Sequence, residues 1–446
     1  MRAARRQSPT LVPFISRKVA IWVLSAVVLL AACSSGTPPK VIKIGVDLPL
    51  NGGAGRAGTP ALNGVEFFFE RHPTLDGFTV QVVSLDDAAD GVDDPAQGEH
   101  NVTALAGDSL VAGVIGPFDS TVARKVIPVA NSAHLALISP AVSSRCLTKE
   151  PYLPAALTPD RVAVSCKAAG FPDPAQLRPS GTNNFFRLAT TDELQGPAAA
   201  DYAYKTLQLR RMAVLSDHEA YGQALAAAFM ARFEKVGGSV VGHLDFDPAG
   251  SINLTAFMRS AKADGAQAMY FGGVTANHGC VIRAQMASVF SAGEAAPLLG
   301  GDGIAQDPDC VRHAGPNAVG IYATVPAAAP ETISTAQPVI AAFKAKHHNA
   351  ADYGAYTIAA YDAAGVLYAA IDLAIKAAGG KAPSRDAVVA QLAATTAFNG
   401  ASGTIGFDSA GDTTLRLVSV FESRSADPSA PWSFVTTVDY SAALPY

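Results

Sequence analysis

Several signatures of catalysis and metal binding are missing from this sequence. It contains no GxSxG nucleophile motif, no HExxH zinc motif and no CxxC pair. A hydrolytic nucleophile needs a neighbouring base, and structural zinc needs clustered cysteines or histidines, so these absences argue against a hydrolase and against a zinc site. Asp217-His218-Glu219 is the nearest approach to an acid–base group, but adjacent side chains diverge, which favours a solvated loop. We expect no catalytic residue, cofactor or metal.

Charge is scarce, and its balance is acidic. Charged residues make up 16% of the chain and hydrophobic residues 49%, with a formal net charge of −5. This composition is typical of a globular protein, and 446 residues are enough for two domains. An acidic chain argues against nucleic acid as a partner.

The N-terminal segment, residues 1–32, is predicted to be a lipoprotein signal peptide. Five basic residues precede an uncharged apolar run over residues 19–32, which is too short for a comfortable membrane span. The run leads into Leu-Ala-Ala-Cys at residues 30–33, which resembles the bacterial lipobox. We expect Cys33 to carry lipid and residues 33–40 to form a flexible tether. A plain secretory signal with an incidental cysteine is the alternative.

Four further cysteines predict two disulfides. An even number of cysteines in an exported protein favours disulfides, although the sequence alone allows three pairings. We favour Cys146 with Cys166 and Cys280 with Cys310, because each pair closes a loop within one local region. A zinc site is the competing interpretation. The first pair opens a proline-rich stretch, residues 146–184, which we predict to be a disulfide-stapled surface insertion.

The rest of the chain alternates strand-like and helix-like runs, which predicts an α/β fold with mostly parallel sheets. A long helix is expected at residues 355–378 and a shorter one at residues 385–393. An alanine-rich polar stretch, to which no helix or strand is assigned, precedes the long helix. The predicted strands before that stretch include residues 41–50, 78–85, 185–188, 212–216, 240–246, 268–271, 297–299 and 319–325.

Residues 111–144 hold two short apolar strands, each followed by small and hydroxyl residues. The first strand leads into polar caps at the start of a helix, whose free N–H groups suit an anion. If the two strands are parallel, their carboxyl ends open on the same crevice. This crevice is the predicted ligand site.

An ordered set of short motifs runs along the chain from residue 41 to about residue 412. The set includes KIGVDLPL at 43–50, VIGP at 114–117, ISP at 138–140, QGP at 195–197, YFGG at 270–273 and GGDG at 300–303. In this order the motifs resemble type I periplasmic solute-binding proteins. More narrowly, they resemble the branched-chain amino acid (Leu/Ile/Val) binding family that serves ABC importers.

The resemblance implies two doubly wound lobes joined by three crossing segments, with ligand trapped as the lobes close. Lobe one would comprise residues 41–188 and 326–402, including the insertion. Lobe two would comprise residues 189–325 and 403–446.

The resemblance also implies which residues hold the ligand. Hydroxyl and backbone groups after the two strands would meet the carboxylate and ammonium of an amino acid, an acidic residue of lobe two would meet the ammonium, and a tyrosine would cover the ligand. These positions correspond here to Ser120, Thr121, Ala141, Ser143, Asp302 and Tyr221.

Two positions depart from the family pattern. Asp119 stands in a loop that is often rich in hydroxyls, and its charge would be unfavourable beside a ligand carboxylate unless it faces away. Arg56 stands where relatives often offer an aromatic residue, and it could hold a second anionic group. Residues 53–58 around it match GxGxxG, but an exported protein would seldom meet NAD, so we expect a flexible ligand-facing loop.

Together these features predict a lipid-anchored, extracytoplasmic substrate-binding protein. It would capture an amino acid or similar small zwitterion and deliver it to the permease subunits of an ABC importer. A ligand-binding sensor on the same fold is an alternative, and an exported enzyme is a less favoured one, because fold does not fix function.

Overall fold

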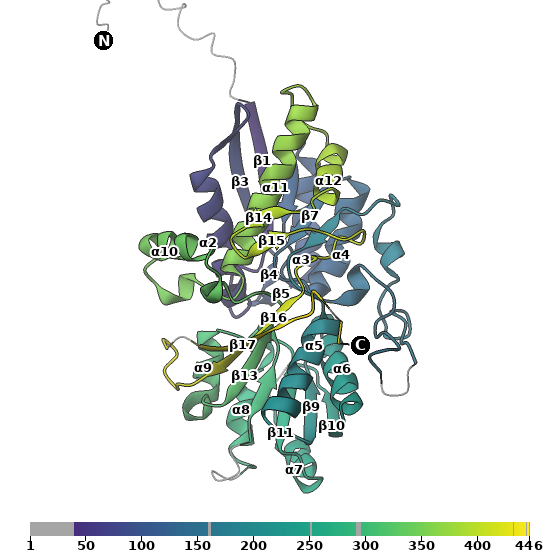
Figure 1. The fold of residues 1–446 in the computed structure, drawn as a ribbon, viewed down its shortest axis with the longest axis vertical. Coiled ribbons are helices and arrows are strands. Elements are labelled where there is room, and N and C mark those ends of the chain that lie inside the picture. The colour runs from purple at the N-terminus through teal and green to yellow at the C-terminus, as the bar shows by residue number, and fades with distance from the viewer. Residues whose placement is uncertain are drawn as a thin grey trace, which may run out of the picture. The chain divides into compact units, whose positions relative to one another are not determined.

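The computed structural model describes residues 40–158, 162–249, 252–290, 296–430, 432–442 and 444–445. The predicted signal peptide, Cys33 and the residues before Lys40 lie outside the described residues. Val41–Tyr446 forms one compact unit. Its two sheets, each with its covering helices, are called lobe one and lobe two below; lobe one is the upper and lobe two the lower in Figure 1.

Lobe one is built on a six-stranded sheet in the order β2-β3-β1-β6-β7-β8, in which β1, β6, β7 and β8 pair in parallel. Both faces of the sheet are covered, so β6 (VAGVI) is buried throughout, as parallel strands require. The strands are β1 (Lys40–Leu48), β2 (Thr74–Leu75), β3 (Phe78–Asp86), β6 (Val111–Ile115), β7 (Ala136–Ser139) and β8 (Phe185–Arg187).

The helices of lobe one cover the sheet in two layers. Val114 packs with α3 and α4, whereas its neighbour Ile115 joins the cluster that contains α2 and α11. The helices are α2 (Gly55–Arg71), α3 (Pro95–Gly107), α4 (Ser120–Ser132), α10 (Gln337–Lys346), α11 (Thr357–Ala377) and α12 (Arg385–Ala393); two small hairpins, β4 (Ala88–Ala89) with β5 (Val92–Asp93) and β14 (Phe398–Gly400) with β15 (Gly403–Ile405), complete it.

Helix α11 is long and apolar enough to cross a membrane by length and composition. However, 72% of its most apolar window is buried inside the protein, and it packs against α2 and the first sheet. It is therefore a core helix of lobe one.

Lobe two is built on a seven-stranded sheet in the order β10-β9-β11-β12-β13-β16-β17. The first five strands are parallel, and the last two return antiparallel from the C-terminal tail. The strands are β9 (Arg211–Ser216), β10 (Ser239–Asp245), β11 (Ala268–Gly272), β12 (Leu298–Gly300), β13 (Ile321–Val325), β16 (Leu417–Ser423) and β17 (Ser433–Asp439); the helices are α5 (Asp192–Asp201), α6 (Ala220–Lys235), α7 (Thr255–Ala263), α8 (Val281–Met286) and α9 (Pro308–Ala314). The α/β prediction is confirmed.

One local expectation was wrong, and one helix was not predicted. The glycine-rich segment is not an open loop, because α2 already begins at Gly55. A Cβ on Gly58 would lie 1.9 Å from the Pro49 carbonyl oxygen, so this glycine allows helix and strand to pack closely. The alanine-rich stretch contains α10, whose Phe343 packs edge-on against Phe67 of α2 with ring centroids 5.4 Å apart.

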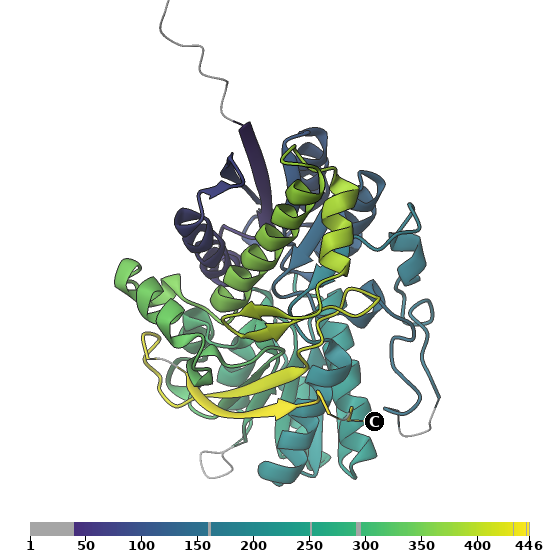
Figure 2. The same ribbon diagram turned by 45° about the horizontal axis from the view of Figure 1, so that its top comes forward.

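Both predicted disulfides are present. Cys146 pairs with Cys166 and Cys280 with Cys310, with Cα–Cα distances of 5.7 and 4.9 Å. The stapled insertion follows β7 of lobe one, but its apolar residues cluster with the alanines on one side of α6 in lobe two. Figure 2 shows it running alongside that helix. The insertion therefore contacts both lobes.

A buried ion network lies where the lobes are joined. Arg187, at the end of β8, has no exposed surface and donates from Nε to Asp412 Oδ1 at 2.8 Å. Asp412 lies in the segment that leads to β16, and its Oδ2 is 2.7 Å from Lys149 Nζ. Thr190 N donates to Pro326 O at 2.7 Å, and this bond joins the segment after β8 to the segment after β13.

The basic side chains of Arg187 and Lys149 stabilise the charged form of Asp412. Burial alone would raise the pKa of this carboxyl, but the positive charges of Arg187 and Lys149 outweigh burial and hold the pKa below its ordinary value. Removing one partner of such a network leaves the others buried without compensation.

We expect Asp412→Asn to lower the free energy of unfolding at pH 7 by about 3–5 kcal/mol, measured by urea denaturation. The stabilising effect of a lowered carboxyl pKa is present above the unfolded value of about 3.9 and is lost as the pH falls through the folded value. The gap between variant and wild type should therefore narrow in acid. Asp386→Asn is the control, because the Asp386–His134 pair is exposed and worth at most about 1 kcal/mol. Equal losses in the two variants would contradict this account.

Candidate functional site

A cavity lies between the two lobes. It encloses about 560 Å³ of empty space, including space open to solvent. Its lining comes from loops after β1, β6 and β7 in lobe one and after β11 and β12 in lobe two, together with the start of α6. The carboxyl ends of parallel strands thus face one another across the cavity, where open α/β sheets bind ligands.

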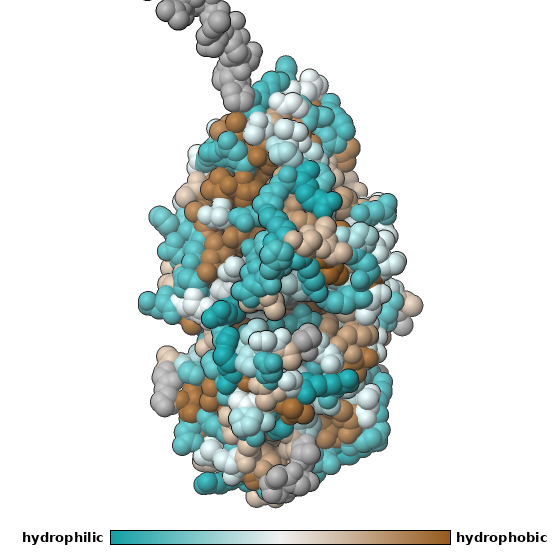
Figure 3. All heavy atoms as spheres, turned by 90° about the vertical axis from the view of Figure 1, so that its left-hand side faces the viewer, coloured by the Kyte–Doolittle hydropathy of each residue, from teal (hydrophilic) through white to brown (hydrophobic). Residues whose placement is uncertain are grey.

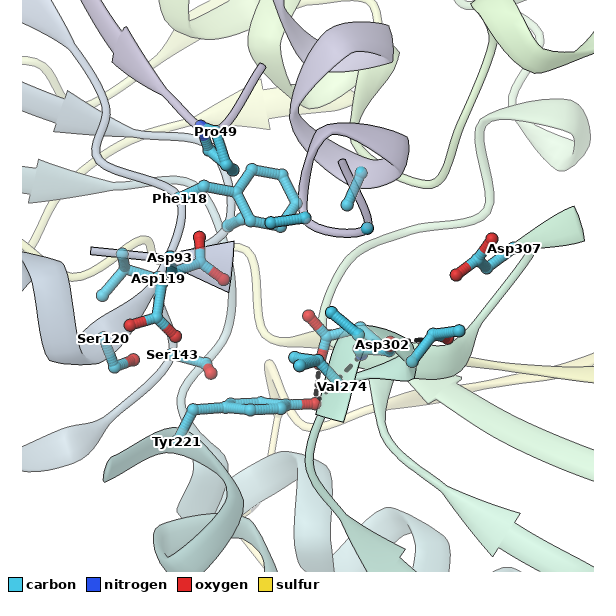
Figure 4. A pocket seen from close by; sticks show the side chains of 18 residues that line it. Pro49, Asp93, Phe118, Asp119, Ser120, Ser143, Tyr221, Val274, Asp302 and Asp307 are labelled. Carbon is cyan, nitrogen blue, oxygen red and sulfur yellow. Dashed lines mark hydrogen bonds between the residues drawn. The ribbon is translucent and has the colours of Figure 1, made fainter. Parts of the chain in front are cut away.

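Five of the seven predicted ligand residues line this cavity. Ser120 and Ser143, with Ala141 beside them, come from the two strand ends of lobe one, and Tyr221 and Asp302 come from lobe two. Figure 4 shows the two serines on one side of the cavity and the tyrosine and the aspartate reaching in from the other lobe. The parallel strand order is what brings these distant segments together.

The other two predicted residues do not line the cavity. Thr121 donates from its hydroxyl to Glu219 Oε2 at 3.1 Å. Arg56, whose side chain is 51% exposed, pairs from Nε with Asp309 Oδ2 at 2.7 Å. Each contact joins lobe one to lobe two, so the structure uses these residues to connect the lobes across the cleft.

Asp302 is the most heavily hydrogen-bonded carboxylate of the cavity. It accepts from Tyr221 Oη at 2.7 Å, from Gln195 Nε2 at 2.8 Å and from Tyr356 Oη. Burial raises the pKa of Asp302, and these three donors oppose the rise by stabilising its charged form. Tyr356 stands at the start of α11, so this bond also joins the lobes.

The start of α4 already holds a carboxylate of the protein. Asp119 caps the helix, accepting from Thr121 N at 2.6 Å and from Val122 N at 3.1 Å. Its side chain lines the cavity and does not face away. Burial raises its pKa, and the helix N–H groups oppose that rise.

The second loop of lobe one also uses its N–H groups internally. Ala141 N and Val142 N donate to Ser139 Oγ at 3.2 and 2.9 Å. Ser144 N donates to Ser120 Oγ at 3.3 Å. These hydroxyls hold the two loops in place.

Three acidic or phenolic groups of the site were missed from the sequence. Asp93, in the small β4–β5 hairpin, and Asp307, at the start of α9, both line the cavity, and Tyr356 bonds to Asp302. Burial raises the pKa of Asp93 well above its ordinary value, and the neighbouring charge of Asp119 raises it further. The acidic run at residues 86–94 was the available signal. In the described part of the chain, no group of three or more His, Cys, Asp or Glu side chains is placed to hold a metal ion.

Two lobes, three segments that connect them and a cavity between strand ends are the arrangement of a two-lobed binding protein. The sequence profile described as periplasmic binding protein matches residues 41–428. The chain belongs to this family.

Its relatives agree with that assignment. The chain is 28% identical over 381 residues to the Leu/Ile/Val-binding protein homolog 3 of Brucella melitensis, a match that covers 85% of this chain and 91% of that protein. It is 26% identical over 381 residues to a Leu/Ile/Val-binding protein of Rhizobium johnstonii, with the same coverage.

Solved structures share the fold. A leucine-binding protein from Thermotoga maritima has a TM-score of 0.72 at 24% identity and covers 90% of this chain and 99% of its own. A solute-binding protein of an ABC transporter from R. palustris, in complex with 4-hydroxybenzoate, has a TM-score of 0.70 at 19% identity and covers 90% and 97%.

We expect Tyr356→Phe to weaken the contact between the lobes. The variant keeps the ring, which packs edge-on against Phe118 with centroids 5.3 Å apart, but removes a hydrogen bond to a charged partner worth about 1.5–3 kcal/mol. Small-angle X-ray scattering of the ligand-free protein should show a larger radius of gyration. Tyr353→Phe is the control, because its hydroxyl bonds to Glu331 at 2.9 Å outside the cavity. The same radius in both variants would show that this bond does not hold the lobes.

Proposed function

We propose that this chain is the extracytoplasmic substrate-binding component of an ABC importer and that it captures an amino acid or a similar small amine. The observation that carries the proposal is the cavity between the lobes, to which both lobes contribute polar side chains. The relatives that are named Leu/Ile/Val-binding proteins support the solute class and a role in binding rather than catalysis.

In this proposal Asp302 holds the ammonium group of the ligand. Three donors favour the charged form of its carboxylate, which has lone pairs left for a further donor. Ser120, Ala141 and Ser143 contact the ligand from lobe one, and Tyr221 covers it from lobe two. Thr121 and Arg56 act indirectly, through their contacts between the lobes.

Closure of the lobes would distinguish the ligand-bound protein from the ligand-free protein. A ligand that touches both lobes favours the closed state by its extra contacts there. We propose lobe boundaries at residues 41–188 with 326–402 and 189–325 with 403–446, and bending in the three segments that cross between them. The permease would distinguish the closed surface from the open one, and lipid on Cys33 would hold the protein beside it.

We expect Asp302→Ala to weaken binding at least tenfold, because a charge-assisted hydrogen bond is worth about 1.5–3 kcal/mol. Ser143→Ala should weaken it less. The measurement is isothermal titration with the best compound from a thermal-shift screen of amino acids and amines, since a ligand that binds only the native state raises its stability.

Asp264→Ala, at an exposed position after α7 in lobe two, is the control and should bind like the wild type. If Asp302→Ala and Ser143→Ala both kept wild-type affinity, the proposed site would be wrong.

A further inference from the structure

We propose that the ligand is an organic cation without a carboxylate, an amine whose nitrogen lies among Asp93, Asp119 and Asp302. This inference rests on the proposed function and narrows its ligand class. It follows from the charges that line the cavity, from the donors that the cavity lacks and from its apolar wall.

The cavity carries negative charge from both lobes. Asp93 and Asp119 line it from lobe one, and Asp302 and Asp307 line it from lobe two. Among the described residues that line it there is no Lys, Arg or His. A ligand carboxylate would therefore meet only like charges, which costs affinity, whereas an ammonium would meet opposite charges on both sides.

Four N–H groups that could bind a ligand carboxylate are already bonded within the protein. The N–H groups of Thr121 and Val122 at the start of α4 are bonded to the Asp119 carboxylate. In the other loop, Ala141 N and Val142 N are bonded to Ser139 Oγ. A ligand carboxylate at the start of α4 would have to displace the Asp119 carboxylate from these N–H groups.

The surroundings of Asp93 favour a positively charged ligand group. Its Oδ1 is shielded from solvent and accepts no hydrogen bond from any described residue. Figure 4 shows Asp93 beside Asp119, with Asp302 and Tyr221 across the cavity. Burial, together with the charges of Asp119, Glu219 and Asp217, raises the pKa of Asp93. An ammonium at this point would supply hydrogen bonds and offset the repulsion.

The approach to the cavity is acidic too. An adjoining pocket shares Asp93 and Asp119 with the cavity and adds Asp217, Glu219 and Asp247. Its two histidines are already engaged: His218 bonds to Asp245, and His278 Nε2 lies 3.2 Å from Pro248 O. An acidic cleft with low-dielectric walls concentrates cations near its opening.

The remaining wall is apolar, which favours an organic cation over a hydrated metal ion. Phe118, Val142 and Val274 line it together with Pro49 and small alanines. Such a wall suits the hydrocarbon part of an amine. By contrast with this apolar cavity wall, the outer face shown in Figure 3 has hydrophobic patches on both lobes that alternate with hydrophilic residues.

Matched probes test the inference directly. Isothermal titration would compare leucine with isoamylamine, lysine with cadaverine and arginine with agmatine, each pair differing only by the carboxylate, and would include Ca²⁺ as a metal probe. We expect the amine of at least one pair to bind at least about tenfold more tightly than its amino acid. Tighter binding of the amino acid in every pair would overturn the inference and leave the proposed function intact. Binding of Ca²⁺ without any amine would also overturn it, and binding of no probe at all would contradict both.

Variants that each remove one carboxylate charge test where the ligand nitrogen lies. Asp93→Asn and Asp119→Asn should each weaken binding of the preferred amine at least about tenfold, and Asn preserves the helix cap at position 119. Asp94→Asn is the matched control: Asp94 follows Asp93 directly and caps α3 through Ala96 N and Gln97 N, but it does not line the cavity. If all three variants bound the amine equally well, the nitrogen would lie elsewhere.

Discussion

Several carboxylates share the cavity between the lobes without a basic side chain among the described residues that line it. The protein stabilises two of them from within: Asp302 through two tyrosines and a glutamine, and Asp119 through the amides at the start of α4. Asp93 has no such support at Oδ1. Under the proposed function, repulsion among these carboxylates would oppose close approach of the lobes without ligand, and a bound cation would offset it. Ligand charge and lobe closure would thereby be coupled.

The charged groups where the lobes are joined differ from those of the cavity, because they pair with groups of opposite charge. There Arg187 and Lys149 both pair with Asp412, and Lys149 also pairs with Asp408, so each charge at the joint has a partner of opposite sign. The disulfide-stapled insertion, which follows β7 of lobe one, contacts lobe two through a separate apolar cluster on α6. Across the cleft, by contrast, the lobes meet through single polar contacts, such as Arg56 with Asp309 and Thr121 with Glu219. In the proposed closure, these single contacts would break and re-form as the ligand enters, whereas the joint would persist.

Much of this architecture follows from the sequence. Alternating apolar runs predicted the parallel sheets, local spacing predicted both disulfides, and the two strand ends predicted the position of Ser120, Ala141 and Ser143. Long-range contacts could not be predicted in this way. Tyr356 reaches Asp302 from 54 residues further along the chain, and Asp93 comes from a two-residue strand within a polar run. Helix α10 depends on packing of Phe343 against α2 more than on its own pattern.

A crystal structure of the protein with the tightest-binding amine would show where the ligand nitrogen lies. We expect the nitrogen within hydrogen-bond distance of Asp93 or Asp119 and of Asp302, with Asp119 still capping α4. A ligand carboxylate bound to Thr121 N and Val122 N, with Asp119 turned out of the cavity, would contradict this expectation.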